Sequence, residues 1–208
     1  MIIAVDGPSA AGKGTLARGI AKALGYHFLD TGSLYRAVAL LMLRQGKSLG
    51  DAAAAAEVAA DLDLARVRDE DLRTEEVAAA ASRISVYPKV RANLLQFQRD
   101  FAARKPGAVL DGRDVGTVVC PKADLKFFVT ASTDVRARRR YDELRSLRHD
   151  TTYEAVLDDI RARDERDATR STAPTAMADD AILIDTSELD RDEALKAVMD
   201  VVREYVAG

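Results

Sequence analysis

Residues 1 to 15 read MIIAVDGPSAAGKGT, and this stretch decides the fold class. The β-branched run from Ile2 to Val5 is typical of a short strand that is buried in a parallel sheet. A glycine-rich turn follows, and from about Lys13 to Leu24 the spacing of apolar residues predicts a helix. A strand, a glycine-rich turn and a helix in this order predict the first unit of an α/β domain.

The turn between this strand and this helix has the Gly-x4-Gly-Lys spacing of a P-loop. Its glycines let backbone N–H groups converge on phosphate oxygens, and the start of the helix adds a favourable dipole. We therefore expect ATP to bind here, with Lys13 bridging the β- and γ-phosphates. The expected ATP ligands are Gly7, Pro8, Ser9, Ala10, Ala11, Gly12, Lys13, Gly14 and Thr15. An ordinary glycine-rich turn is the structural alternative.

One position departs from the usual form of this loop. A Ser or Thr normally follows the lysine, whereas here Gly14 follows it and the hydroxyl comes one place later, at Thr15. We expect Thr15 to be a ligand of the Mg²⁺ that accompanies ATP. Because kinases, ATPases and GTPase switches all share this loop, the rest of the chain must identify the reaction.

Strands and helices alternate along the remainder of the chain. This alternation predicts βαβ units and a parallel sheet with helices on both faces. Asp51 is a candidate N-cap, and Ser132 or Thr133 is a candidate cap for a helix that carries the Arg136 to Arg140 run. Strands are expected at 26–29, 108–110, 126–130 and 182–184, and helices at 33–45, 51–65, 74–86, 88–104 and 190–206.

Length and composition bound the class of protein. The 208 residues suit one domain, and 48% hydrophobic with 31% charged residues is ordinary for a soluble chain. A net charge of -3 gives no support for nucleic-acid binding, and no apolar run approaches the roughly 20 residues of a membrane span. Cys120 is the single cysteine, so no disulfide can form within the chain, which fits a reducing compartment. We expect Cys120 itself to be a small buried apolar side chain. The expectation is a cytoplasmic enzyme, and a monomer.

Residues 30–36 read DTGSLYR and lie between the second expected strand and a helix. Ligands of open α/β sheets bind at the carboxyl ends of strands. With Arg36 in the first turn of the helix, its guanidinium and the helix dipole favour a second phosphate, separate from the P-loop. We expect Asp30, Tyr35 and Arg36 to line this acceptor site. The alternative is an exposed arginine and a core tyrosine.

Residues 111–114 read DGRD and directly follow another expected strand. Two carboxylates and an arginine at the end of a strand are poor choices for a simple turn. One carboxylate is suited to interact with magnesium through water, and Arg113 is suited to hold a phosphate. A structural turn with a local ion pair is the alternative.

An apolar stripe between 153 and 170 turns into a charged one. Tyr153, Val156, Leu157 and Ile160 share one face of a helix, and the same face continues through Arg163, Asp167 and Arg170, with Arg166 beside it. Arginines near one aspartate suit phosphates and a ribose diol, since the planar guanidinium binds two oxygens at once. A solvated surface with i, i+4 ion pairs is the alternative.

Taken together, these motifs resemble the bacterial cytidylate kinases. The resemblance spans nearly the whole chain and keeps the order of the motifs, which are GPSAAGKGT, DTGSLYRA, PKVR at 88–91, DGRDVGTVV at 111–119 and RDERD at 163–167. GKGT by itself is shared with many kinases, whereas the later motifs are more specific.

The resemblance implies transfer of the ATP γ-phosphoryl group to CMP or dCMP with magnesium, in pyrimidine nucleotide metabolism. By position it assigns cytosine to Ser82, Arg91 and Asp114, and the ribose to Arg163 and Asp167. It assigns the acceptor phosphate to Arg36 and Arg170, and the phosphate centre to Arg113. We expect Lys13, Arg113, Arg166 and Arg170 to surround the transferred group.

The cytosine assignment also makes chemical sense. Cytosine offers an amino donor at N4 and acceptors at N3 and O2, which match an ionised Asp114 and the Arg91 guanidinium. Uracil presents O4 and N3–H instead, so like groups would face one another, and an unpaired buried polar group costs about 1–3 kcal/mol.

The expected architecture is a three-layer P-loop kinase core with a parallel five-stranded sheet. Within a single domain, 1–208, we expect a core (1–50, 92–142 and 175–208), a monophosphate-binding insert (51–91) and a lid (143–174). Longer family members carry a small β-sheet in the insert, but here only about ten charged residues, Arg66 to Glu75, fill that gap. The insert should therefore be reduced and helical.

Two other functions are compatible with the P-loop. One is a kinase for another small metabolite, such as UMP or shikimate. The other is a nucleotide-binding switch. Two features argue against a switch: the chain lacks an Asn-Lys-x-Asp guanine motif, and it has a second basic phosphate site that a switch would not need.

Overall fold

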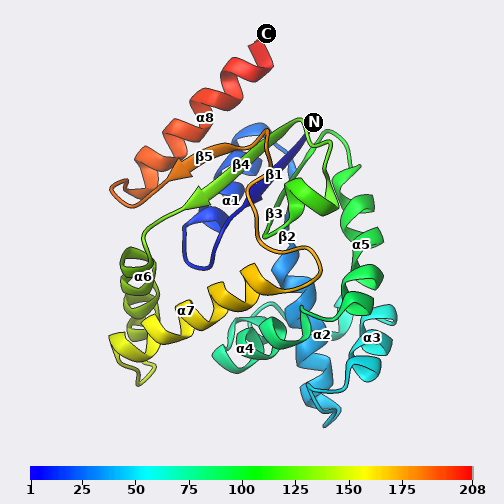
Figure 1. The fold of residues 1–208 in the computed structure, drawn as a ribbon. Coiled ribbons are helices and arrows are strands. Elements are labelled where there is room, and N and C mark those ends of the chain that lie inside the picture. The colour runs from blue at the N-terminus through cyan, green and yellow to red at the C-terminus, as the bar shows by residue number, and fades with distance from the viewer. Residues whose placement is uncertain (208) are drawn as a thin grey trace.

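A computed structural model describes residues 1–207, with side chains as far as Val206 (Figure 1). The strands are β1 (Ile2–Asp6), β2 (His27–Asp30), β3 (Ala108–Gly112), β4 (Leu125–Thr130) and β5 (Ile182–Asp185). The α-helices are α1 (Lys13–Leu24), α2 (Thr31–Arg44), α3 (Ala52–Ala60), α4 (Glu75–Ile84), α5 (Pro88–Ala102), α6 (Thr133–Ser146), α7 (Tyr153–Thr169) and α8 (Arg191–Ala207).

The five strands form one parallel sheet in the order β2-β3-β1-β4-β5. Alternate residues of β1 enter two different cores, because successive side chains point to opposite faces. Ile3 and Val5 pack with α1 and α8, whereas Ala4 packs with Ala102 of α5 and with a π-helical turn, η3 (Val115–Val119). The predicted three-layer α/β architecture is confirmed.

The P-loop leaves β1 and enters α1 as predicted. Gly7 has φ 144°, and a Cβ there would lie 1.9 Å from the Val129 carbonyl oxygen, so only glycine permits this passage. Gly12 has φ 88° and precedes the first residue of α1. Both glycines therefore allow the loop to turn tightly over the carboxyl end of the central strand.

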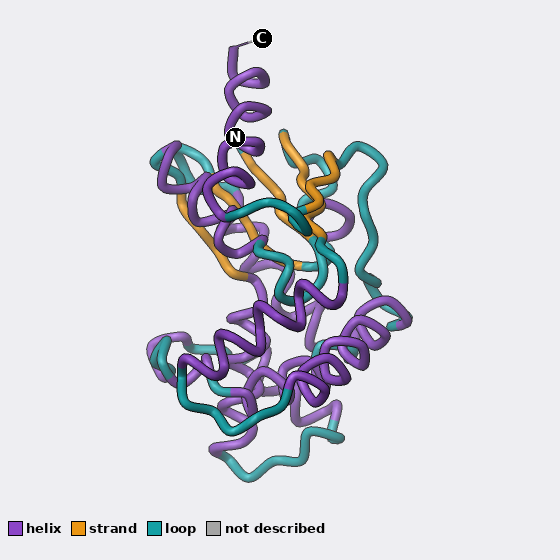
Figure 2. Tube along the Cα trace, turned by 90° about the vertical axis from the view of Figure 1, so that its left-hand side faces the viewer, coloured by secondary structure: helices purple, strands orange, loops and turns teal. Residues whose placement is uncertain are grey.

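Helices α2 to α5 form a second core below the sheet (Figure 1), and Figure 2 shows that this lower part of the molecule consists of helices and loops. Asp51 caps α3 as predicted, accepting from the backbone N–H groups of Ala53 and Ala54. The expected helix 51–65 was too long, because α3 ends at Ala60 and Asp63 caps a separate 3₁₀ turn, η1 (Leu64–Arg66). Residues 45–107, all of them described, contain no strand, so the segment is helical as expected.

Helices α6 and α7 form a hairpin that carries α7 across the end of the sheet towards α4 (Figure 1). Its own small core contains Ala137, Leu144, Val156 and Ile160. Ser132, rather than Thr133, caps α6 by accepting from the Val135 backbone N–H. No helix within residues 1–207 combines the length and apolarity that crossing a membrane requires.

Candidate active site

The P-loop lysine lies at the carboxyl end of the central strand. Lys13 is the first residue of α1, and its Nζ donates to the Pro8 carbonyl oxygen at 3.2 Å. Burial, followed by the nearby Arg113 guanidinium, lowers the pKa of Lys13 to about 8. Thr15 is exposed in the same first turn. The lysine is held against the loop, and its charge is only partly compensated within the site.

Asp111 lies beneath the first turn of α1. Its Oδ1 is 3.8 Å from Lys13 Nζ and has no hydrogen-bond partner within residues 1–207. Burial raises the pKa of Asp111, and Lys13 opposes that shift. A Cβ on Gly14 would lie 2.9 Å from Asp111 Oδ2. Glycine at the position after the lysine, where Ser or Thr is usual, therefore leaves room for this carboxylate.

The segment 30–36 places an ion pair beside this site. Arg36 NH2 donates to Asp30 Oδ2 at 2.6 Å. Although burial opposes the ionisation of Asp30, Arg36 holds the pKa of this carboxyl below its usual range. Helix α2 begins at Thr31, so Arg36 lies in its second turn rather than the first as expected. The guanidinium nevertheless reaches back to the amino end of the helix.

The three residues assigned to cytosine gather on one side of the site. Arg91 NH2 donates to Asp114 Oδ2 at 2.5 Å, and both residues are buried. The Arg91 guanidinium also lies 5.5 Å from the centre of the Tyr35 ring. Ser82 is buried on α4, where its Oγ accepts from Arg166 Nε at 3.2 Å. Helices α4 and α7 therefore meet at Ser82.

The charged stripe of α7 faces the interior. Asp167 Oδ2 accepts from Arg113 Nε at 3.0 Å, and Asp167 Oδ1 is 4.0 Å from Arg170 NH1. Burial opposes ionisation of Asp167, but Arg113, Arg163 and Arg170 outweigh it and hold the pKa of this carboxyl below its usual range. With Asp167 and Arg170 buried, the solvated-surface alternative is wrong.

Arg170 lies just past the helix. Helix α7 ends at Thr169, and Arg170 has extended backbone angles, φ -60° and ψ 138°, rather than continuing the helical face. Its NH2 is 3.5 Å from Asp114 Oδ1 and has no hydrogen-bond partner within the described chain. An unpartnered nitrogen of a buried guanidinium is suited to an anionic ligand.

Arg163 occupies a different part of the same region. Burial, and next the Arg113 guanidinium, lower the pKa of Arg163 to about 10. A guanidinium that lowers the pKa of a neighbouring arginine marks a site of positive potential. The P-loop, Arg36, Arg113 and the arginines of the α7 segment thus converge on one space at the carboxyl end of the sheet.

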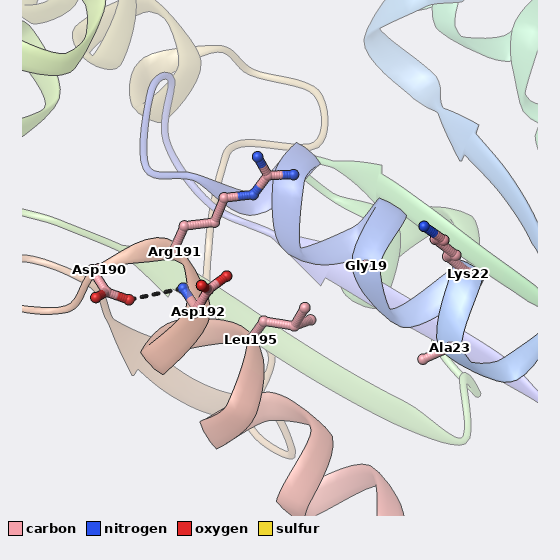
Figure 3. Close-up of a pocket in the computed structure, with 7 residues that line it drawn as sticks. All are labelled: Gly19, Lys22, Ala23, Asp190, Arg191, Asp192 and Leu195. Carbon is pink, nitrogen blue, oxygen red and sulfur yellow. Dashed lines mark hydrogen bonds between the residues drawn. The ribbon is translucent and has the colours of Figure 1, made fainter.

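An open pocket of about 770 Å³ lies elsewhere, between α1 and the start of α8 (Figure 3). Lys22, Asp190, Arg191 and Leu195 are among the residues that line it. It contains none of the residues predicted for ATP or for the acceptor. The candidate active site is therefore defined by its converging charged side chains and not by this pocket.

Comparison with known proteins decides the family. The family model described as cytidylate kinase matches residues 3–204. The chain belongs to the cytidylate kinase family. As a member, it is an ATP-dependent nucleoside monophosphate kinase.

Full-length relatives of known name agree with this assignment. A cytidylate kinase from Rhodopseudomonas palustris is 52% identical over 208 residues, covering 100% of this chain and 98% of the relative. One from Xanthobacter autotrophicus is 54% identical over 208 residues, covering 100% of both.

Solved structures resemble the chain more distantly and support the fold alone. An uncharacterized protein from Eubacterium ventriosum has a TM-score of 0.56 at 14% identity, with 98% of each chain covered. A sugar kinase from Janibacter sp. has a TM-score of 0.50 at 13% identity, covering 97% of this chain and 94% of that one.

Sequence reasoning gave no definite role to two carboxylates of this region. Either aspartate of the 111–114 turn was a candidate to interact with magnesium, and the position of Asp111 at the end of a buried strand is a usable signal. Asp6 was passed over, although it ends β1 directly before Gly7. Cys120, predicted to be a buried apolar side chain, is buried, and burial raises the pKa of its thiol to about 11.

Proposed function

We propose that this chain transfers the γ-phosphoryl group of ATP to CMP and dCMP, forming ADP and the cytidine diphosphates. The observation that carries the acceptor choice is the buried Arg91–Asp114 pair, with Ser82 and Tyr35 around it. A carboxylate beside a guanidinium complements the N4 amino donor and the N3 and O2 acceptors of cytosine. The names of the relatives agree with this choice.

In this proposal the phosphates of both substrates meet between the P-loop and α7. Residues 7–15 hold ATP, and Arg36 and Arg170 hold the acceptor phosphate. Arg163 and Asp167 contact the ribose, while Lys13, Arg113, Arg166 and Arg170 surround the transferred group. Asp30, which pairs with Arg36, keeps that guanidinium oriented.

The chemistry follows from the charges of the reactants. An oxygen of the CMP phosphate attacks the γ-phosphorus, the bond from that phosphorus to the β–γ bridging oxygen breaks, and ADP leaves with the electron pair. Since the acceptor oxygen is already anionic, no protein general base is needed. The arginines and Lys13 neutralise charge that develops on the equatorial oxygens.

Magnesium fits the residues that are present. The Thr15 hydroxyl and the unpartnered Asp111 Oδ1 are hard oxygen ligands, and both lie beside the P-loop lysine or in its helical turn. No cluster of three or more potential metal ligands is found within residues 1–207. That agrees with an ion held largely by ATP phosphates and water. When bound, Mg²⁺ would neutralise phosphate charge.

The assignment of segments of the chain to a core, an insert and a lid is also a proposal. The core comprises 1–50, 92–142 and 175–208, the insert 51–91 and the lid 143–174. The contact between the insert and the lid, at Ser82–Arg166, supports closure of these two parts over the acceptor, and Glu75 ties the insert to Arg140 of α6 in the core. Closure would exclude water, which otherwise competes as acceptor. We place the reaction in the cytoplasm, catalysed by a monomer.

A substrate panel tests the proposal. Initial rates of ADP formation would be measured with saturating ATP-Mg and each common ribo- and deoxyribonucleoside monophosphate, with shikimate as a further acceptor. The expected result is ADP formation that depends on CMP or dCMP, with much lower kcat/KM for UMP. Equal rates with UMP, or ADP formation without any acceptor, would refute it in favour of another kinase or a hydrolytic switch.

A further inference from the structure

Asp6 is a buried carboxylate that the proposed reaction does not use. It ends the central strand β1 and directly precedes Gly7 of the P-loop. Its register partners are Gly112 on β3 and Phe128 on β4. Asp6 therefore lies beside the point where β3 leaves the sheet and the Arg113–Asp114 segment begins.

Both oxygens of Asp6 bind the backbone that follows Asp114. Oδ1 accepts from the Val115 N–H at 2.8 Å, and Oδ2 accepts from the Gly116 N–H at 2.7 Å. These are the first two residues of η3, and the first N–H groups of a helical turn have no partner within the turn. A single side chain from β1 thus satisfies two buried donors of a neighbouring segment.

The surroundings leave room for this carboxylate. A Cβ on Gly116 would lie 3.3 Å from Asp6 Oδ2 and 3.1 Å from Lys126 Cδ, and a Cβ on Gly112 would lie 3.6 Å from Asp6 Oδ1. Burial raises the pKa of Asp6 to about 6, although the hydrogen bonds from Gly116 and Val115 lower it and the carboxylates of Asp114 and Asp111 raise it. At pH 7.5 the side chain is therefore mostly ionised and accepts with both oxygens.

The backbone that Asp6 anchors carries two side chains that point to different parts of the site. Arg113 pairs with Asp167 on α7, and Asp114 pairs with Arg91 on α5. The Asp114 carbonyl oxygen also accepts from the N–H groups of Val118 and Val119 within η3. A shift of this turn would consequently move the base-reading carboxylate relative to the P-loop.

We propose that Asp6 is a positioning residue for acceptor recognition, which fixes the Arg113–Asp114 turn by accepting the Val115 and Gly116 N–H groups. This inference rests on the proposed function, since it concerns how Asp114 is placed to read cytosine. It also links the two substrates, because the same residue connects the strand that enters the P-loop to the turn that reads the acceptor.

The test is Asp6→Asn, which keeps the shape but replaces one acceptor oxygen with an amino donor that faces a backbone N–H. We expect KM for CMP to rise on the order of tenfold to a hundredfold, as for a displaced positioning group, while KM for ATP changes little. The kcat/KM ratio of CMP over UMP should fall by a similar factor. A purely structural role would instead lower activity with both acceptors alike.

Asp124→Asn is the matched control. The Asp124 carboxylate is exposed and accepts from the Ile2 N–H at 2.6 Å, at the opposite end of the same strand. It should leave the CMP over UMP ratio unchanged. A loss of discrimination in both variants would overturn the positioning role in favour of a general loosening of β1.

Gly116→Ala is a second test variant if Asp6→Asn does not fold, because its methyl group would lie 3.3 Å from Asp6 Oδ2 and displace that oxygen. The same decrease in CMP preference, in a smaller amount, supports the inference. An unchanged ratio in every folded variant overturns it while the proposed function stands. A wild-type enzyme that shows no preference for CMP would refute the proposed function itself, so the two failures are distinguishable.

Discussion

Replacement of Asp114 by asparagine would separate base reading from folding. Asp114 is buried between two arginines, with Oδ2 at 2.5 Å from Arg91 and Oδ1 at 3.5 Å from Arg170. Asparagine keeps the shape and one acceptor oxygen but removes the negative charge and adds an amino donor. The N4 amino group of cytosine loses its charged acceptor, whereas the O4 atom of uracil gains a hydrogen-bond donor.

The magnitude follows from hydrogen-bond energies. A hydrogen bond to a charged group contributes about 1.5–3 kcal/mol and a neutral one about 0.5–1.5 kcal/mol, so cytosine loses roughly 1–1.5 kcal/mol. That corresponds to about a five- to tenfold decrease in kcat/KM for CMP. Uracil is relieved of an unpaired O4 that costs about 1–3 kcal/mol, which raises kcat/KM for UMP about fivefold or more. The CMP over UMP ratio should therefore fall about thirtyfold or more.

The assay is a coupled measurement of ADP formation with CMP and UMP on the same enzyme sample. Removing one charge of a buried cluster also destabilises the fold, by up to about 3–5 kcal/mol where a partner is left uncompensated. The ratio of two acceptors does not depend on the folded fraction, so it isolates recognition. Rates should be measured well below the Tm of the variant.

Asp71→Asn is the control for this experiment. Asp71 accepts from Arg44 at 2.7 Å and from Arg68 at 3.0 and 3.1 Å, so it is also a carboxylate shared by two arginines, but it lies in the connection between α3 and α4. It should leave the CMP over UMP ratio unchanged. Proportional losses with CMP and UMP in Asp114→Asn would refute the assignment of Asp114 to the base.

Three further predictions use the same assay or thermal unfolding. Arg170→Ala should lower kcat about a hundredfold without a matching loss of Tm, because this residue would stabilise the transferred group. A large decrease in Tm with unchanged kcat would support a structural ion pair instead. Gly14→Ser should raise KM for ATP and lower Tm, because its Cβ would lie 2.9 Å from Asp111 Oδ2, and a variant with wild-type values would contradict that steric reason. The pKa of Asp6 is raised from 3.8 to about 6 on folding, so its protonated form stabilises the fold below about pH 4 and this contribution is lost as the pH rises through 6. Relative to Asp6→Asn, the free energy of unfolding of the wild type should therefore fall by about 2.4 kcal/mol between pH 4 and pH 7, and a pH-independent difference in denaturant titrations would count against it.

The P-loop and the secondary structure around it could be predicted from local sequence alone. The strand before Gly7 and the helix from Lys13 follow from side-chain periodicity and from glycine, both of which act over a few residues. The residues at which helices end could not be predicted as accurately. The expected helix 51–65 stops at Ala60, since the side chains of Asp61 and Asp63 favour turns over a continued helix.

The residues that we propose for the acceptor site come from motifs, but their contacts could not be predicted from the sequence. Arg91, Asp114 and Arg170 come from a helix, a turn and a segment beyond another helix, and they meet only because the chain folds back across the end of the sheet. A charge pattern indicates that arginine and aspartate suit phosphate and base. It does not say which arginine pairs with which aspartate, because burial and separation set that choice.

The sequence by itself determined the phosphate loop, the α/β class and the family, since each rests on short motifs whose order is written in the chain. Only the tertiary structure decided the contacts of Asp6 and the burial of Asp167 and Arg170. Asp6 is 109 and 110 residues from its two hydrogen-bond donors, and no local pattern links them. Long-range pairing of β1 with β3 brings the Asp6 carboxylate to these N–H groups. The contact stabilises the fold because a buried N–H group without a partner costs free energy.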